Sequence, residues 1–283
     1  MSFYKLTKAQ LKNLERIEAW MKGQPFKENS RDKHPAVPHL SHEDVREQWV
    51  PGWNPSETGQ FFTPREMAYH VANHYVPAST SAYDWRILEP CAGLGSLIAP
   101  LPLAVQRNVT AYEAGREVYE VGQRITPLAT WHNDSPFEHM AEIEGKFDLV
   151  LCNPPFGTTW AMYEAGVICK SGATRSEHQF LELAIRALKP DGAAVFIAPY
   201  NLADKMPKAM KAWFSERAEL TANEGPLPGK FQQTNIRVNA FVFTRTGESE
   251  HPVEAATIKV EASPIELANV PVRYNSGEQL ALF

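Results

Sequence analysis

The clearest structural signal in the chain is Leu149-Val150-Leu151-Cys152-Asn153-Pro154-Pro155-Phe156-Gly157. The apolar run at its start is continuous rather than alternating, which is typical of a buried parallel strand. Two prolines then stop the strand and also prevent a helix, because each proline lacks an N–H and fixes φ. The segment predicts a rigid loop at the carboxyl end of a strand, which is where open α/β sheets bind ligands.

This loop carries hydrogen-bond acceptors that suit a planar amino group. Asn153 offers a side-chain carbonyl, and Pro154 offers a backbone carbonyl in a fixed conformation. Phe156 offers a flat face on which a base can stack. A plain proline-rich turn after a core strand is the alternative, and the tetrapeptide alone leaves both interpretations open.

Composition limits the class of protein. The chain has 283 residues, a net charge of −5 and 43% hydrophobic residues. These values suit one large α/β domain with appendages and give no global signal for nucleic-acid binding. Cys91, Cys152 and Cys169 lack metal-ligand spacing and do not suggest a disulfide framework. Finding no signal peptide or membrane span, we expect a cytoplasmic protein with no metal and no membrane partner.

A second strand end carries a glycine-bearing turn, Ile87-Leu88-Glu89-Pro90-Cys91-Ala92-Gly93-Leu94-Gly95, and an apolar helix is expected after it. Gly93 and Gly95 let the backbone pass close to a ligand. The spacing is not that of a dinucleotide fingerprint, and no phosphate-binding Lys-Ser/Thr follows, which argues against nicotinamide cofactors and nucleoside triphosphates. Glu89, at the strand end, suits a cation such as a sulfonium or an amino group.

Two further short strands are expected to end in acidic residues. The first, Val109-Thr110-Ala111-Tyr112, leads to Glu113, at the position where βαβ nucleotide folds place an acid on the ribose hydroxyls. A surface acid in a loop is the alternative for Glu113. The second strand ends in the segment Thr130-Trp131-His132-Asn133-Asp134-Ser135-Pro136-Phe137.

A capped helix is predicted upstream of these strands by Gly59-Gln60-Phe61-Phe62-Thr63-Pro64-Arg65-Glu66. Thr63 suits the N-cap, Pro64 the first helical position and Glu66 the first turn. We expect this helix to run to about Tyr75.

Three of these motifs resemble those of DNA adenine-N6 methyltransferases. Asn153-Pro154-Pro155-Phe156 resembles the Asn-Pro-Pro-aromatic motif of amino-methyltransferases. Residues 59–66 resemble the Gly-Gln-aromatic-Phe-Thr-Pro segment, in a form closest to the modification subunits of type I restriction systems. Residues 89–95 resemble the family's Asp/Glu-Pro-x-x-Gly-x-Gly cofactor loop. The resemblance covers residues 59 to 245.

The resemblance implies an α/β, Rossmann-like S-adenosylmethionine-dependent methyltransferase fold. Its sheet would be seven-stranded and mostly parallel, with helices on both faces and one antiparallel strand near an edge. It implies S-adenosyl-L-methionine as cofactor and methyl transfer to adenine N6 after base flipping, without a covalent nucleophile. The implied catalytic residues are Asn153, Pro154, Pro155 and Phe156. The implied cofactor-binding residues are Phe62, Thr63, Pro64, Glu89, Pro90, Cys91, Ala92, Gly93, Gly95, Glu113, Asp134, Ser135 and Asn153.

The following part of the chain fits the same resemblance. A helix at 177–188, a turn at 189–192 and a buried strand at 193–199 resemble the family's Glu-His-x-Phe helix, Leu-Lys-Pro-Gly-Gly turn and apolar strand, with Asp191 in place of the first glycine. A basic helix is expected at 205–217 and a strand at 238–244. Candidate phosphate-contacting residues, for which ordinary solvent exposure is the alternative, are Lys170, Arg175, Lys205, Lys208, Lys211, Lys230 and Arg237.

We divide the chain into an N-terminal arm (1–58) with helices at 7–22 and 41–49, a catalytic domain (59–246) and a flexible tail (247–283). The tail ends in Gln279-Leu280-Ala281-Leu282-Phe283, which resembles the peptide that bacterial proteins insert into the β sliding clamp. Gln279, Leu280, Leu282 and Phe283 are therefore candidate partner-binding residues. Docking of the tail on its own domain is the alternative.

Several functions remain open at this point. The Asn-Pro-Pro-aromatic motif also occurs in rRNA guanine-N2 and protein-glutamine methyltransferases, although residues 59–66 argue against both. A catalytically silent DNA- or clamp-binding module is another alternative. The chain has no obvious target-recognition domain, so a separate specificity subunit is a further expected partner besides DNA.

Overall fold

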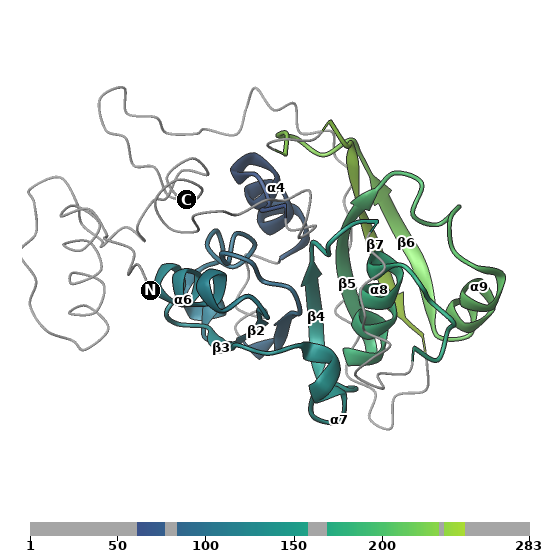
Figure 1. Cartoon of the computed structure of the whole chain (residues 1–283), viewed down its shortest axis with the longest axis horizontal. Helices are drawn as coiled ribbons and strands as arrows, with labels where there is room; N and C mark the ends of the chain where they lie inside the picture. Colours follow the sequence, from purple (N-terminus) through teal and green to yellow (C-terminus); the bar gives the residue numbers. More distant parts are fainter. Residues whose placement is uncertain (1–60, 77–83, 158–168, 232–234, 247–283) are drawn as a thin grey trace, which may run out of the picture.

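The computed structural model describes residues 61–76, 84–157, 169–231 and 235–246 (Figure 1). The predicted arm at 1–58, with its two helices, lies outside these residues. The tail at 247–283, with its clamp-binding-like peptide, lies outside them as well. The arm, the tail and the domain boundaries therefore stay predictions.

The described residues form a seven-stranded sheet in the order β3-β2-β1-β4-β5-β7-β6. β7 runs antiparallel to its neighbours β5 and β6, and the other neighbouring pairs are parallel. The predicted mostly parallel sheet with an antiparallel strand near one edge is confirmed. The strands are β1 (Ile87–Glu89), β2 (Val109–Tyr112), β3 (Thr130–His132), β4 (Phe147–Cys152), β5 (Leu188–Pro199), β6 (Ala218–Glu224) and β7 (Val238–Arg245).

Helices cover both faces of this sheet. Figure 1 shows β4 leaving the short helix α7 and pointing its carboxyl end toward α4, while α8 lies against β5. The helices are α4 (Arg65–Tyr75), α5 (Leu103–Gln106), α6 (Arg116–Ile125), η3 (Pro136–His139), α7 (Met140–Ile143), α8 (Ser176–Ala187) and α9 (Lys208–Ser215). None of the helices within the described ranges has the length and apolar character that crossing a membrane requires.

Two hydrophobic cores flank the sheet, and β4 contributes to both. Leu149 and Leu151 face the core that contains α4, whereas Val150 and Cys152 face the core that contains α8. All four side chains are fully buried. Burial on both faces is the reason that the strand is a continuous apolar run rather than an alternating one.

The predicted N-cap of α4 is wrong. Pro64 occupies the cap position, and no side chain caps the helix. The Thr63 hydroxyl instead accepts a hydrogen bond from Asn153 Nδ2 at 2.9 Å. A contact across 90 residues of sequence has replaced the local cap, so Thr63 ties the helix start to the loop after β4.

Three other elements differ from expectation. Turns follow the glycine loop up to residue 101, and the expected apolar helix is reduced to the four residues of α5. β5 begins at Leu188, so the predicted turn at 189–192 lies within the strand, where the pairing with β4 shifts register and Asp191 has a φ of 62°. The edge strand β6 was not assigned because it is mostly exposed and has no apolar run. Position 191 thus holds an aspartate in a conformation that favours glycine.

Candidate active site

The loops after β1 and β4 meet where the strand order reverses. β1 pairs with both β2 and β4, so the chain leaves β1 toward one edge of the sheet and leaves β4 toward the other. Cys91 Sγ lies 3.6 Å from Cys152 Sγ and donates to the Asn153 carbonyl at 3.3 Å. This is the topological switch point at which open α/β sheets bind ligands.

Asn153 has a fixed amide orientation. Its Nδ2 donates to the Phe61 carbonyl at 3.1 Å and to Thr63 Oγ1 at 2.9 Å. These two bonds use both amide protons, so Oδ1 is left as the free acceptor. Oδ1 is buried and has no hydrogen-bond partner among the described residues.

Pro154 supplies a second open acceptor. The carbonyls on either side of it are engaged, by Cys91 Sγ at Asn153 and by Ser176 Oγ at Pro155 (2.7 Å). Within the described parts of the chain, no donor reaches the carbonyl of Pro154 itself. The loop therefore presents two carbonyl oxygens, Asn153 Oδ1 and Pro154 O.

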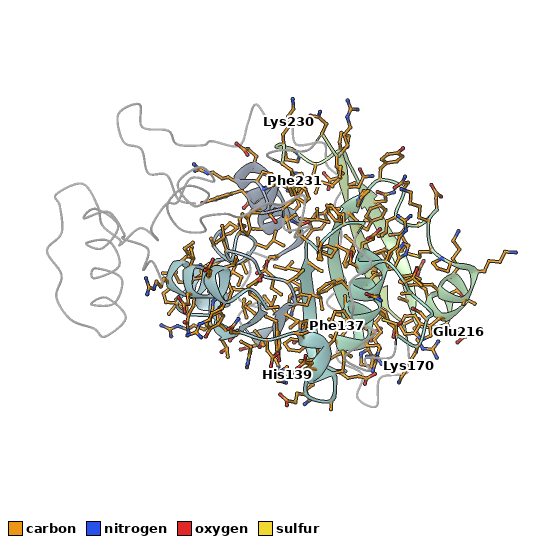
Figure 2. All side chains as sticks on the ribbon, in the orientation of Figure 1. Phe137, His139, Lys170, Glu216, Lys230 and Phe231 are labelled. Atoms are coloured by element: carbon orange, nitrogen blue, oxygen red, sulfur yellow. The ribbon has the colours of Figure 1, made fainter. Side chains whose placement is uncertain are left out.

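Aromatic rings surround this loop. Phe156 is partly exposed, and the buried Phe231 meets it edge-on with ring centroids 6.3 Å apart. Phe231 meets Phe61 in the same way, also at 6.3 Å. Figure 2 places Phe231 beside Lys230, at the end of the molecule where α4 lies. Sequence analysis did not single out Phe231, although an aromatic residue within the polar loop 225–237 was a usable signal.

The glycine loop is closed on one side by Phe62. Gly93 and Gly95 have φ values of 56° and 76°, which non-glycine residues rarely adopt. A Cβ on Gly93 would lie 3.2 Å from the ring of the buried Phe62. The segment 61–63 thus contacts both the glycine loop and Asn153, and it brings three separate sequence motifs into one site. The same segments contain three further predicted residues: Pro64 directly follows residues 61–63, and Pro90 and Ala92 lie in the loop after β1. Ala92 N donates to the Tyr112 carbonyl at 2.8 Å.

Two buried acidic residues, Glu89 and Glu113, make this site favourable for a positively charged ligand. Burial and the neighbouring Glu113 raise the pKa of Glu89 well above its usual value, and Glu89 Oε2 has no partner among the described residues. Burial also raises the pKa of Glu113, to about 6, against the opposite effect of the N–H groups of Gly115 (2.7 Å) and Gly93 (2.9 Å) that donate to it. A buried orphan carboxylate oxygen beside a second acid fits a cationic ligand.

Asp134 lies at the carboxyl end of β3 and already has partners. It accepts from Ser135 N and from His139 Nε2, each at 2.8 Å. The His139 bond is the main cause that lowers the pKa of Asp134 and raises that of His139. Tyr112 stacks on His132 next to this pair, with centroids 4.7 Å apart. Nothing in the local sequence indicated His139 as the residue that orients Asp134.

The structure separates the candidate DNA-contacting cations. Lys230 and Arg237 lie in the loop between β6 and β7. Arg175 and Lys205 lie near the start of α8, close enough to His178 for their positive charges to disfavour its protonation. These four lie toward the end of the sheet that holds Asn153. Lys170 lies toward the opposite end, close enough to Glu144, just before β4, for its positive charge to favour the ionised form of Glu144 (Figure 2). Lys208 and Lys211 are exposed on α9.

The cysteine thiols are poorly suited to nucleophilic attack. Burial raises the pKa of both Cys91 and Cys152 above the usual value for a thiol. A reactive cysteine needs the opposite shift, since the thiolate is the nucleophile. The two residues are better explained as small packing groups between the loops.

Gly122 is a packing position next to the glycine loop. An added Cβ would lie 2.4 Å from the Trp131 ring and 2.9 Å from the Gly93 carbonyl. We expect Gly122→Ala to cost about 1–3 kcal/mol of stability through overpacking and to weaken binding of a ligand at the glycine loop. Thermal unfolding and a ligand titration would measure both, with Glu117→Ala on the exposed face of α6 as control. Unchanged ligand affinity would contradict the link to Gly93.

Comparison with known proteins bears on the fold of the chain. A sequence model of the family described as Eco57I restriction-modification methylase matches residues 116–222, which include the loop after β4. A search of the curated proteins found no significant match.

Three solved structures show the same fold. A modification subunit of a type I restriction enzyme from Vibrio vulnificus YJ016 is 20% identical, with a TM-score of 0.54 over 68% of this chain and 46% of that one. A protein described as a class I S-adenosylmethionine-dependent methyltransferase from Listeria monocytogenes is 16% identical, with 0.52 over 68% and 63%. A type I restriction-modification methyltransferase subunit from Streptococcus thermophilus is 18% identical, with 0.52 over 66% and 45%. The chain spans less than two thirds of each.

The fold is therefore that of an S-adenosylmethionine-dependent methyltransferase, and S-adenosyl-L-methionine is the expected cofactor. Residues 116–222 are similar to the restriction-modification methylases that this family model describes. The resemblance to restriction-modification methyltransferases that the sequence motifs indicate is thereby confirmed.

Proposed function

We propose that the chain transfers a methyl group from S-adenosylmethionine to the N6 amino group of adenine in DNA. The pair of open acceptors, Asn153 Oδ1 and Pro154 O, carries this proposal. A buried acceptor without a partner costs about 1–3 kcal/mol, so a ligand with two N–H donors on one atom is the natural complement. An exocyclic amino group has this arrangement.

The chain's own residues would position and polarise that amino group. Two acceptors draw both N–H protons to one side, which leaves the nitrogen lone pair directed toward a methyl donor. The partly exposed Phe156 provides a face for the base, which must leave the duplex at a cost of a few kcal/mol. S-adenosylmethionine supplies an activated methyl group on a cationic sulfur, so the protein contributes mainly position and electrostatics.

The cofactor-binding role of the first strand ends has separate support. Glu89, with its orphan oxygen, and the neighbouring Glu113 favour a cationic ligand. Phe62 and the positive-φ glycines shape the adjacent surface. We assign the cofactor to this side of the switch point and the target base to the Asn153 side.

Cations at the Asn153 end of the sheet would contact DNA phosphates. Because the net charge of the chain is −5, such contacts must be local. We expect Arg237→Ala to weaken DNA binding about equally for all sequences and to lower the slope of log K against log salt by about one. Lys170→Ala, at the opposite end, is the matched control and should change neither. Equal effects of the two variants would contradict this surface.

Modification-sensitive sequencing of DNA from a methylation-deficient bacterium that expresses this chain tests the function. Adenine methylation at a defined motif would establish a self-sufficient, sequence-specific enzyme. Scattered adenine methylation would support the chemistry and assign sequence choice to a separate specificity subunit. If the purified chain binds the cofactor but methylates rRNA or protein instead of DNA, the proposal is wrong.

A further inference from the structure

We propose that Ser176 and Glu177, at the start of α8, are positioning residues that determine which carbonyl of the catalytic loop faces the substrate. The catalytic loop is defined as residues 153–157. The inference rests on the proposed roles of Asn153 and Pro154, and it assigns a function to two side chains that bond to the catalytic loop.

The catalytic loop has little means of holding itself. Pro154 and Pro155 have no N–H, so two of its five residues cannot donate a backbone hydrogen bond. Groups from elsewhere in the fold hold it instead. Before Pro154, the anchor is Cys91 Sγ at the Asn153 carbonyl. After Pro154, Ser176 Oγ donates to the Pro155 carbonyl at 2.7 Å, and Glu177 Oε2 accepts from Gly157 N at 2.9 Å.

These anchors leave one carbonyl open by fixing its neighbours. Each peptide unit is planar, so the direction of the Pro154 carbonyl follows from the two units that flank it. One flanking carbonyl is held by Cys91 and the other by Ser176. Loss of the anchors after Pro154 would free that side of the loop to rotate, and the Pro154 carbonyl would lose its alignment with Asn153 Oδ1.

Several properties of Glu177 suit it to hold the catalytic loop. Its side chain is only 6% exposed, and its Oε1 lies 3.6 Å from Arg175 Nη1. It also lies in the first turn of α8, where the helix dipole favours a negative charge. A hydrogen bond from an N–H to a carboxylate is stronger than one to a neutral acceptor. Gly157 has a φ of 69°, a conformation that favours glycine, and its N–H bonds to Glu177 at the end of the loop.

The same helix contains a matched control. Glu182 is 1% exposed and also accepts backbone N–H bonds, from Lys170 at 2.7 Å and Ser171 at 2.9 Å. These bonds hold residues 170 and 171 and no residue of the catalytic loop. A variant of Glu182 therefore measures the general effect of removing a buried carboxylate from α8.

The test compares Glu177→Ala, Glu177→Gln, Ser176→Ala and Glu182→Ala in the full chain. We expect Glu177→Ala to lower kcat about 10- to 100-fold, because small misplacements of reacting groups have effects of this size, with cofactor affinity within about twofold. Glu177→Gln keeps an acceptor for Gly157 N and should restore most of the loss, whereas Ser176→Ala should fall between the two. Glu182→Ala should lower the melting temperature but leave kcat within about twofold. Equal kcat values in Glu177→Ala and Glu182→Ala would overturn the inference.

Hydrogen exchange gives a readout that needs no substrate. Within residues 154–157 only Phe156 and Gly157 carry an amide N–H, so a peptide from this region reports on the anchored end of the loop. Exchange there should be faster in Glu177→Ala than in Glu182→Ala. Equal protection in both would overturn the inference even if the wild type methylates DNA. A wild type that never methylates DNA would overturn the proposed function and leave the exchange result to decide this one.

Discussion

Replacing Asn153 with alanine is expected to lower kcat about 10²- to 10³-fold, the range found when one preorganised hydrogen-bonding group is removed from an active site. The variant loses Oδ1, one of the two open acceptors, so the substrate amino group would be held only by the Pro154 carbonyl. Single-turnover methylation of an adenine-containing duplex would measure the loss. Cofactor binding should persist, because the buried acids lie at other strand ends.

Two further variants separate the acceptor from its support. Asn153→Asp keeps an acceptor but removes both N–H donors and places a carboxylate near the Phe61 carbonyl, so we expect it to be nearly as inactive as the alanine variant. Thr63→Ser keeps the hydroxyl that accepts from Asn153 Nδ2 and should stay within a fewfold of the wild type. Full activity in Asn153→Ala, with the protein folded, would refute the assigned chemistry.

The sequence predicted every strand of the sheet except β6, because each of the others carries a signal in its own residues. β4 is buried on both faces, and an uninterrupted apolar run is the direct consequence. The prolines after it end the strand for covalent reasons, which no tertiary contact can change. β6 left no such trace, because a mostly exposed edge strand needs no apolar pattern.

The site was predicted in its parts but not in its connections. Thr63 illustrates the reason. A Thr-Pro-x-Glu segment favours a capped helix locally, but the Thr63 hydroxyl instead accepts a hydrogen bond from Asn153, which is distant in sequence. The roles of Ser176 and Glu177 were likewise not predicted. Glu177 begins the helix that resembles the family's Glu-His-x-Phe motif, but the groups that Ser176 and Glu177 bind lie about 20 positions upstream. Lys170 shows the same limit for charge, as it lies close to the catalytic loop in sequence but toward the other end of the sheet.

Glu89→Gln is expected to weaken binding of S-adenosylmethionine at least about tenfold, which corresponds to about 1.4 kcal/mol. The change removes a buried carboxyl group whose Oε2 has no hydrogen-bond partner among the described residues. The effect should therefore be larger for a cationic ligand than for S-adenosylhomocysteine, which lacks the sulfonium. Calorimetric titration with both ligands measures the difference. Equal losses for the two ligands would show that Glu89 acts through shape rather than charge.

The pH dependence of binding should follow from the same acid. Burial and Glu113 raise the pKa of Glu89, so its carboxyl group tends to hold a proton when no cation is present. A cation favours the ionised form, and binding should therefore release a proton and tighten as pH rises. The pKa of Glu113, about 6, places part of this change between roughly pH 5 and 7. Titrations in buffers of different ionisation enthalpy would reveal the proton, and Glu89→Gln should reduce it.

Stability should change in the opposite direction to binding. An acid whose pKa is raised by folding loses its proton more easily when unfolded, so the free energy of unfolding falls as pH rises above the unfolded pKa. Glu89 therefore destabilises the ligand-free protein at neutral pH, and the neutral Glu89→Gln should raise the melting temperature there while it weakens cofactor binding. Replacing an acid with a purely structural role would not raise the melting temperature and weaken cofactor binding together. A lower melting temperature in this variant at neutral pH would indicate that Glu89 has a cationic partner in the ligand-free chain.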